Sequence, residues 1–162
     1  MRELGKSIRV YADTSVYGGV LDEEFAGPSR TFFEQVRAGY FRLVLSPVVR
    51  DELGAAPERI QSLFREMLPR AEVADVSEEA VRLHQAYLEA AILVPKWEAD
   101  ALHVALATVS QCRVLVSWNF KHIVNFQKIP LYNGVNLARG YGVLGIHTPQ
   151  EVIAYEEPEE NL

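Results

Sequence analysis

The feature that most constrains the fold is an alternation of short β-rich runs with longer segments of helical periodicity. The runs IRVYA, FRLVLS and RVLVS are rich in β-branched, aromatic and leucine residues. Between them, apolar residues recur every three or four positions, as they do along the buried face of a helix. Strands that alternate with helices indicate a mainly parallel sheet covered by helices on both faces, which is a three-layer α/β/α architecture.

We expect five strands and six helices, on the basis of periodicity and of the residues that start and stop helices. The strands are expected at residues 8–12, 41–46, 70–76, 113–117 and 142–146. The helices are expected at residues 27–40, 46–57, 57–68, 77–93, 96–111 and 148–155. Ser46 followed by Pro47 is a strong helix start, and Ser77 begins a segment that resembles a capping box.

Length and composition favour one globular domain. We treat residues 1–162 as a single domain with a short flexible N-terminus and an acidic C-terminal tail at 156–162. The single cysteine, Cys112, excludes an internal disulfide and a cysteine-based zinc site. We expect a cytoplasmic protein without a membrane partner, because no secretory signal or membrane-spanning stretch is visible. A net charge of −6 argues against a generic polyanion-binding surface, but it does not exclude nucleic acid as a substrate.

Polar residues follow three of the expected strands. In parallel α/β sheets, ligands bind beyond the carboxyl ends of the strands, so these positions are candidates for a site. Asp13 and Ser15 follow the first strand, SPVVRDEL follows the second, and Ser117 and Asn119 follow the strand at 113–117. Asp, Ser and Asn also cap helices and turns, and for each of these residues alone capping is the simpler explanation.

Helical phase selects two further carboxylates. Glu52 lies four residues after Val48 and three after Val49, so it projects toward the core side, where a carboxylate needs a partner. Alternatively, Glu52 reaches past the apolar edge into water. Asp100 lies on an apolar side of its helix together with Val104. The alternative for Asp100 is that it only complements the positive end of the helix dipole.

Three carboxylates far apart in sequence are therefore candidates for one site. If Asp13, Glu52 and Asp100 converge, their mutual repulsion requires a cation, and hard oxygen ligands select Mg²⁺ or Mn²⁺. The four histidines have no metal-ligand spacing among them. The sequence also lacks GxGxxG, GxxxxGK[ST] and GxSxG, which are the motifs of nucleotide-binding loops and of a serine nucleophile.

Four segments, taken in order, resemble a known family. YADTS, SPVVRDEL, EADALHVALA and LVSWNFKHI have the order and spacing of a PIN domain and are similar to its VapC-like branch, the toxin ribonucleases of bacterial toxin–antitoxin pairs. No single motif is specific, and the resemblance covers roughly residues 8–155. It implies a PIN-like parallel β-sheet flanked by α-helices and Mg²⁺- or Mn²⁺-dependent hydrolysis of RNA, which leaves a 3′-hydroxyl and a 5′-phosphate.

The resemblance assigns roles residue by residue. Asp13, Glu52 and Asp100 correspond to catalytic residues that hold the metal, and Ser15 corresponds to the hydroxyl after the first aspartate. The fourth acidic position of the family corresponds to Asn119, which departs from the commonest pattern. An amide forms hydrogen bonds but carries no charge. The departure therefore argues against a second metal ion more than it argues against nuclease activity.

Residues next to Asn119 are candidates for supporting and rim roles. Ser117 is expected to orient a ligand or water. Trp118, Lys121 and His122 are candidates for an RNA-binding rim, with an aromatic surface for bases and cations for phosphates. Alternatively, Trp118 is an aromatic residue of the core or of an interface, and His122 has a structural role. Arg50 and Lys96 are weaker rim candidates, for which ordinary surface charge is the simpler explanation.

The resemblance also implies partners. We expect an RNA substrate, an antitoxin protein that covers or enters the acidic pocket, and a homodimer. The aromatic helix at 27–40 supplies a surface for either protein partner, or it belongs to the core. The alternative function is a catalytically weak or inactive PIN-fold module that binds RNA or a protein, which Asn119 motivates. A phosphatase or receiver-like domain ranks last, because Asp13-Thr14-Ser15 lacks a second acid.

Overall fold

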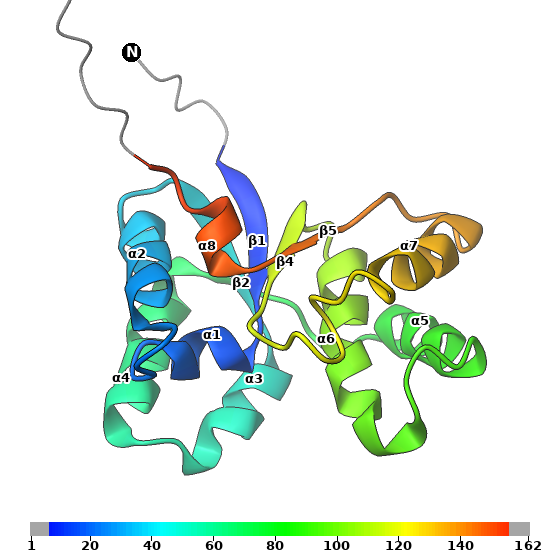
Figure 1. Ribbon diagram of the computed structural model, residues 1–162, viewed down its shortest axis with the longest axis horizontal. Coiled ribbons are helices and arrows are strands. Elements are labelled where there is room, and N and C mark those ends of the chain that lie inside the picture. The colour runs from blue at the N-terminus through cyan, green and yellow to red at the C-terminus, as the bar shows by residue number, and fades with distance from the viewer. Residues whose placement is uncertain (1–6, 156–162) are drawn as a thin grey trace, which may run out of the picture.

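Five parallel strands form one sheet, in the order β3-β2-β1-β4-β5, in the computed structural model, which describes residues 7–155 (Figure 1). The strands are β1 (Ile8–Ala12), β2 (Phe41–Leu45), β3 (Glu72–Val73), β4 (Val114–Val116) and β5 (Gly145–His147). Strands β2 and β3 extend the sheet from one edge of β1, and the chain then crosses over so that β4 and β5 extend it from the other edge. The point where strand order reverses therefore lies between β1 and β4, which is where α/β sheets place their ligands.

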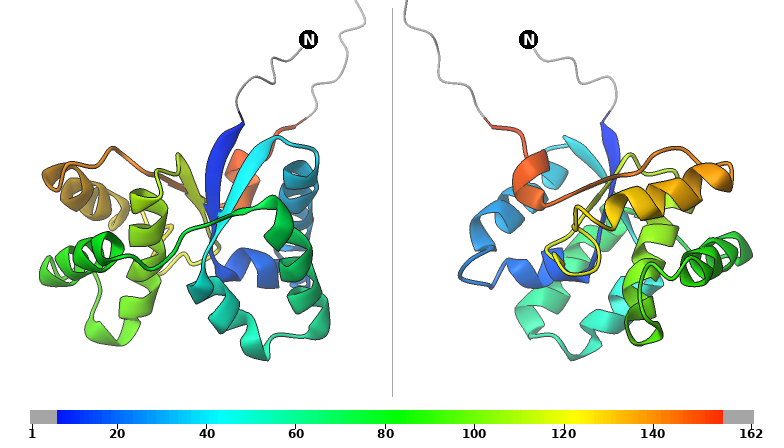
Figure 2. Two further views of the ribbon diagram at one scale, coloured as in Figure 1. Left: turned by 180° about the vertical axis from the view of Figure 1, so that it is seen from behind. Right: turned by 45° about the vertical axis from the view of Figure 1, so that its right-hand side comes forward.

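Eight α-helices flank the sheet in the described part of the chain. They are α1 (Thr14–Gly19), α2 (Ala26–Arg37), α3 (Pro47–Glu52), α4 (Glu58–Met67), α5 (Glu78–Glu89), α6 (Glu98–Val109), α7 (Ile129–Ala138) and α8 (Pro149–Val152). Figures 1 and 2 show α1, α2 and α4 on one side of the sheet and α5, α6 and α7 on the other. Short 3₁₀ turns occupy Leu53–Ala55, Leu68–Arg70 and Pro95–Trp97. The expected α/β/α fold class is confirmed.

The central strand β1 is held on both edges. Tyr11 pairs with Val44 of β2 and with Leu115 of β4, all in parallel register. Tyr11, Val44 and Leu115 are fully buried. A strand covered on both faces by helices has no solvent side, and this explains the nearly continuous apolar runs in β2 and β4.

The expected elements are present, with differences in their bounds and two additional helices. The strand expected at 70–76 is reduced to two exposed residues of β3 at the sheet edge, and β5 begins three residues later than expected. The helix expected at 77–93 ends at Glu89, and Val81, which was expected on its apolar face, is exposed. No element was expected where α1 and α7 lie. The acidic tail at 156–162 lies outside the described residues, as does most of the N-terminal extension.

Tertiary contacts explain α7, whose sequence IPLYNGVNLA contains turn-forming residues. Pro130 stands at the start of the helix, where its missing N–H costs nothing. Tyr132 is buried and donates a hydrogen bond to the carbonyl of His122 at 2.8 Å. Asn136 is also buried, and its side-chain carbonyl accepts a hydrogen bond from Tyr87 of α5. Packing against α5 and the loop after β4 therefore outweighs weak local propensity.

The aromatic face of the helix expected at 27–40 belongs to the core. Phe32, Phe33 and Val36 of α2 are buried, and the Phe32 ring stacks on Phe41 of β2 with centroids 5.2 Å apart. This face is therefore not the partner surface that the sequence left open. Cys112 is buried as well, and burial raises the pKa of its thiol to about 11. No helix between residues 7 and 155 combines the length and apolarity needed to cross a membrane.

Candidate active site

Asp13 lies at the carboxyl end of β1 and is held by two serine hydroxyls. Its Oδ1 accepts hydrogen bonds from the backbone N–H of Ser15 at 3.1 Å and from the Ser15 hydroxyl at 2.6 Å. Its Oδ2 accepts a hydrogen bond from the Ser117 hydroxyl, at the end of β4, also at 2.6 Å. Asp13 thus caps α1 and at the same time joins the ends of the two strands where the strand order reverses. Asp13 therefore caps a helix and is also placed at the candidate site, so the two explanations offered by the sequence are compatible.

Burial raises the pKa of the Asp13 carboxyl. The positive charge of His103 and the hydrogen bonds from Ser117 and Ser15 act in the opposite direction, but the net shift is upward. A buried carboxylate whose ionisation is disfavoured is one that a nearby cation stabilises strongly. Asp13 therefore has the electrostatic character of a ligand for a positively charged group.

Glu52 ends α3 and faces the same region. Its Oε1 accepts a hydrogen bond from the Thr14 hydroxyl and lies 2.8 Å from Nε2 of His103. Burial raises the pKa of Glu52, but the hydrogen bond and charge of His103, together with the Thr14 hydroxyl, outweigh it, so the pKa is lowered. The side chain is 34% exposed, so it leaves the apolar side of α3 without entering the core. The inward projection expected from Val48 and Val49 is correct only in part.

His103 of α6 lies among the three carboxylates. Its ring is buried, with Nδ1 2.7 Å from the hydroxyl of Tyr11, which in turn lies 2.8 Å from the Ser46 hydroxyl. Burial lowers the pKa of His103, but the Glu52 hydrogen bond and the charges of Asp13, Glu52 and Asp100 outweigh burial and raise it. In the protonated ring both nitrogens donate, one to Glu52 and one to Tyr11. His103 therefore contacts Glu52 directly, while Asp13 and Asp100 act on it through their charges.

Asp100 lies in the first turn of α6 and is oriented by the loop after β4. Its Oδ2 accepts a hydrogen bond from the side-chain amide of Asn119 at 3.1 Å and lies 2.7 Å from Nδ1 of His122. Asn119 in turn accepts the backbone N–H of His122 through Oδ1 at 3.0 Å and donates its own backbone N–H to the Ser117 hydroxyl at 2.9 Å. The amide at this fourth position therefore links Asp100 to the hydroxyl that holds Asp13.

The donor chemistry fits a hard divalent cation that is only partly coordinated by protein. Within residues 7–155, no three Asp, Glu, His or Cys side chains are close enough to form a ready-made metal site. However, Oδ1 of Asp100 and Oε2 of Glu52 accept no hydrogen bond from any described residue. Mg²⁺ commonly binds one or two protein carboxylates and keeps several waters. Such a site needs fewer protein ligands than the three carboxylates expected from the sequence.

Two of the expected rim residues are buried. Trp118 is 8% exposed, its ring stacks on Phe25 with centroids 4.2 Å apart, and its indole N–H donates to the Ser29 hydroxyl at 2.8 Å. The expectation that Trp118 stacks on RNA bases is therefore wrong for this ring, which belongs to the core. His122 is also buried and is engaged by Asp100, so it supports the site and is not a free rim cation. Lys121 is exposed, and its rim role stays a prediction.

Sequence reasoning missed His103 and its partners. The only signal was its position three residues after Asp100, which places both on one face of α6. His103 was set aside because the histidines lack metal-ligand spacing, and here it contacts a carboxylate. Ser46 was expected only as a helix start, and the contacts of Thr14, Tyr11 and Ser46 at the site gave no sequence signal, because they depend on how β1, β2 and α6 pack.

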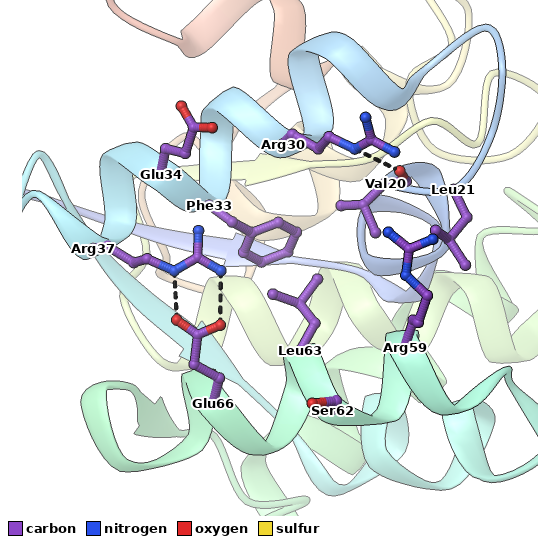
Figure 3. Close-up of a pocket in the computed structure, with 10 residues that line it drawn as sticks. All are labelled: Val20, Leu21, Arg30, Phe33, Glu34, Arg37, Arg59, Ser62, Leu63 and Glu66. Atoms are coloured by element: carbon purple, nitrogen blue, oxygen red, sulfur yellow. Dashed lines mark hydrogen bonds and ion pairs between the residues drawn. The ribbon is translucent and has the colours of Figure 1, made fainter.

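A groove lies apart from the carboxylates. It measures about 290 Å³ and runs between α2 and α4, with Phe33 and Leu63 at its centre (Figure 3). Arg37 and Glu66 form a two-bonded ion pair across one end of it. None of the carboxylates around His103 lines this groove, so it is separate from the candidate active site.

The sheet order and the two helical layers define a PIN-like α/β/α domain. No family model matches the sequence, and no curated protein matches it. Solved structures do match: a chain of VapBC2 from Rickettsia felis bound to a promoter DNA fragment (TM-score 0.56, 20% identity), and a chain of DNA-bound VapBC from Salmonella typhimurium (0.58, 18%). A chain of FitAcB from Neisseria gonorrhoeae also matches (0.52, 12%).

These matches extend over nearly the whole domain. They cover 86%, 88% and 88% of this chain and 98%, 98% and 99% of the matched chains, respectively. At such low sequence identity they establish the fold. The PIN-like architecture expected from the four motifs is therefore confirmed.

Proposed function

We propose that the protein is an Mg²⁺- or Mn²⁺-dependent endoribonuclease, the toxin of a type II toxin–antitoxin pair. The observation that carries the proposal is that Asp13 and Asp100 are linked through Ser117 and Asn119 beyond the ends of β1 and β4, while Glu52 contacts His103 of the helix that carries Asp100. Carboxylates at this position suit binding of a divalent cation and a phosphodiester.

The residues around the carboxylates supply orientation. The cation would be held directly by one or two of the carboxylates Asp13, Glu52 and Asp100 and through water by the rest, and when bound it would polarise a phosphoryl oxygen and lower the pKa of a bound water. Ser15 and Ser117 hold both oxygens of Asp13. Fixed ligands of this kind lose little entropy when the substrate binds.

Hydrogen bonds also fix the orientation of the other two carboxylates, Asp100 and Glu52. Asn119 and His122 hold one oxygen of Asp100 and leave the other open. His103 holds Glu52 through one oxygen, so the second oxygen is open to accept a hydrogen bond from the attacking water. A carboxylate that accepts this bond directs the water toward phosphorus.

An antitoxin partner is part of the proposal. The matched structures are VapBC complexes and FitAcB, and this supports a protein partner for this chain. We propose that the partner covers the carboxylates and blocks RNA, that the protein acts in the cytoplasm, and that it forms a homodimer.

The test is cleavage of a mixed structured RNA by the purified protein with Mn²⁺ or Mg²⁺, and again with EDTA. Asp13→Asn and Asp100→Asn are expected to abolish cleavage. Asp75→Asn is the matched control, because it removes a carboxylate from the exposed segment between β3 and α5. Cleavage that persists in EDTA, or that both site variants retain, contradicts the proposal.

The alternative is a PIN-fold module that binds RNA or a protein without cutting. Asn119 and the lack of a ready-made metal cluster in residues 7–155 favour it. Calorimetry with Mn²⁺ separates the two functions. A nuclease should show Mn²⁺ binding that Asp13→Asn weakens, whereas an inert module should show none that depends on Asp13.

A further inference from the structure

Trp97 is surrounded by cations at the edge of the candidate active site. It ends the 3₁₀ turn before α6 and is 37% exposed. The Nζ of Lys96 lies 5.1 Å from its ring centroid, and the Nζ of Lys121, from the loop after β4, lies 5.8 Å from it. Two segments distant in sequence thus bring two ammonium groups to one partly open indole.

This position is tied directly to the carboxylates. The Trp97 ring packs on His122, with centroids 4.9 Å apart and the planes inclined by 33°. His122 in turn contacts Asp100 through Nδ1 at 2.7 Å. Trp97 is therefore two contacts away from a carboxylate proposed to hold the cation, and a nucleotide on its ring lies next to the site.

The two lysines are available to a ligand. Within residues 7–155, the ion pairs use arginines and histidines, and neither Lys96 nor Lys121 takes part in one. In a chain of net charge −6, two unpaired ammonium groups beside an acidic site form a local positive region. Their flexible stems allow both to leave the ring and contact phosphate oxygens.

We propose that Trp97, Lys96 and Lys121 form a subsite for one nucleotide of single-stranded RNA beside the scissile bond. A base stacks on the open part of the indole, and the ammonium groups bind the flanking phosphates. An aromatic ring with adjacent cations is the arrangement that binds single strands with little regard to sequence. The subsite rests on the proposed function for its substrate class, and it takes over the role that buried Trp118 does not fill.

Binding of a short, mixed-sequence, single-stranded RNA in EDTA tests the subsite without cleavage. The affinities of the unaltered protein and of the Trp97 variants are measured by the fluorescence anisotropy of a labelled RNA. The chain has two tryptophans and Trp118 is buried, so quenching of tryptophan fluorescence in the unaltered protein reports on Trp97. Trp97→Ala is expected to weaken binding by about 5- to 150-fold, the range that one stacked base supplies. Trp97→Phe keeps an aromatic face and should retain most of the affinity, which separates stacking from a general packing defect.

The lysines are tested through the salt dependence of the same binding. Lys96→Ala and Lys121→Ala are each expected to lower the slope of log K against log salt by about 0.7. Arg59→Ala is the matched control, since Arg59 is an exposed cation on α4 at the groove of Figure 3. An equal change in all three variants would show diffuse electrostatic binding and would overturn the subsite.

Two further measurements distinguish this inference from the proposed function. Cleavage by the unaltered protein with Mn²⁺ is measured in parallel. If the protein does not cleave RNA but binds it through Trp97, the nuclease proposal fails and the subsite stands. If it cleaves RNA and Trp97→Ala changes neither binding nor KM, the subsite fails and the nuclease stands. Binding of an acidic peptide is measured as well. If Trp97→Ala abolishes binding of this peptide but leaves RNA binding intact, the subsite is overturned in favour of a contact with a protein.

Discussion

Two adjacent glycines in α1 offer a sharp test of how the core supports the site. Gly18 is exposed, and a Cβ added there meets nothing within 4 Å. Gly19 is buried, and a Cβ there would lie 2.5 Å from Oγ of Ser29 and 3.0 Å from Nε1 of Trp118. We therefore predict opposite effects of Gly18→Ala and Gly19→Ala on stability.

The magnitude follows from the contacts. Gly18→Ala should stabilise the protein by about 0.5–1 kcal/mol, because alanine favours the helical backbone. In Gly19→Ala the Ser29 hydroxyl must move away from the Trp118 N–H, to which it is bonded at 2.8 Å, or the indole must shift. Overpacking of this kind costs about 1–3 kcal/mol, and the lost hydrogen bond costs about 1 kcal/mol more. After the gain in helix propensity is subtracted, Gly19→Ala should lower the free energy of unfolding by roughly 1–3 kcal/mol.

Urea unfolding followed by circular dichroism measures both variants. At a gap of about 2 kcal/mol, their midpoints of thermal unfolding should differ by roughly 4–8 °C. RNA cleavage should also fall in Gly19→Ala, because the backbone N–H of Trp118 donates to the Ser15 hydroxyl, which holds Asp13. Equal stabilities of the two variants would refute the reasoning, since the substitutions differ only in what the new methyl group meets.

Three further predictions concern the site. Ser117→Ala removes a hydroxyl bonded to buried Asp13 and should cost about 1.5–3 kcal/mol at neutral pH, measured by urea unfolding; a neutral result would mean that the bond is not formed in solution. Because the folded pKa of His103 is raised, its charge stabilises the fold fully below the unfolded pKa of about 6.5, and this contribution is lost as pH rises through the folded value. The stability difference between the unaltered protein and His103→Gln should therefore be larger near about pH 6 than in alkaline solution, and a difference that grows with pH would contradict the raised pKa. Asn119→Asp places a like charge 3.1 Å from Asp100, so it should destabilise the metal-free protein and bind Mn²⁺ more tightly in calorimetry; unchanged Mn²⁺ binding would argue against a metal at these carboxylates.

The parts of the fold that were predictable are those with strong local signals. Ser46 accepts the backbone N–H of Val49 and starts α3 as expected, and Ser77 caps α5 in the same way. In contrast, α1 has six residues and ends in two glycines, so its sequence carries almost no helical pattern. It forms because Asp13 caps it and because Val16 and Tyr17 are buried against the core.

The candidate site was predictable to the extent that it depends on strand ends and helical phase. Asp13 and Asp100 followed from those two rules, and the structure brings both near His103. The interior partners did not follow, because the Tyr11–His103 contact joins two elements whose approach only the packed sheet determines. Trp118 was misplaced for a related reason: its stacking partner, Phe25, lies in the segment before α2, which gave no sequence signal.

The pairing of β1 with β4 has a consequence for when the candidate site can assemble during synthesis. The two residues that the Ser117–Asp13 hydrogen bond joins are 104 positions apart, and the central strand has its second neighbour only after residue 114. Contacts of such long sequence separation form late in folding, and a chain emerging from the ribosome lacks them altogether. A nascent chain that ends before β4 already contains Asp13, Glu52 and Asp100, but it lacks Ser117 and Asn119, which connect Asp13 to Asp100. The proposed nuclease would therefore lack its assembled site until most of the chain has been translated.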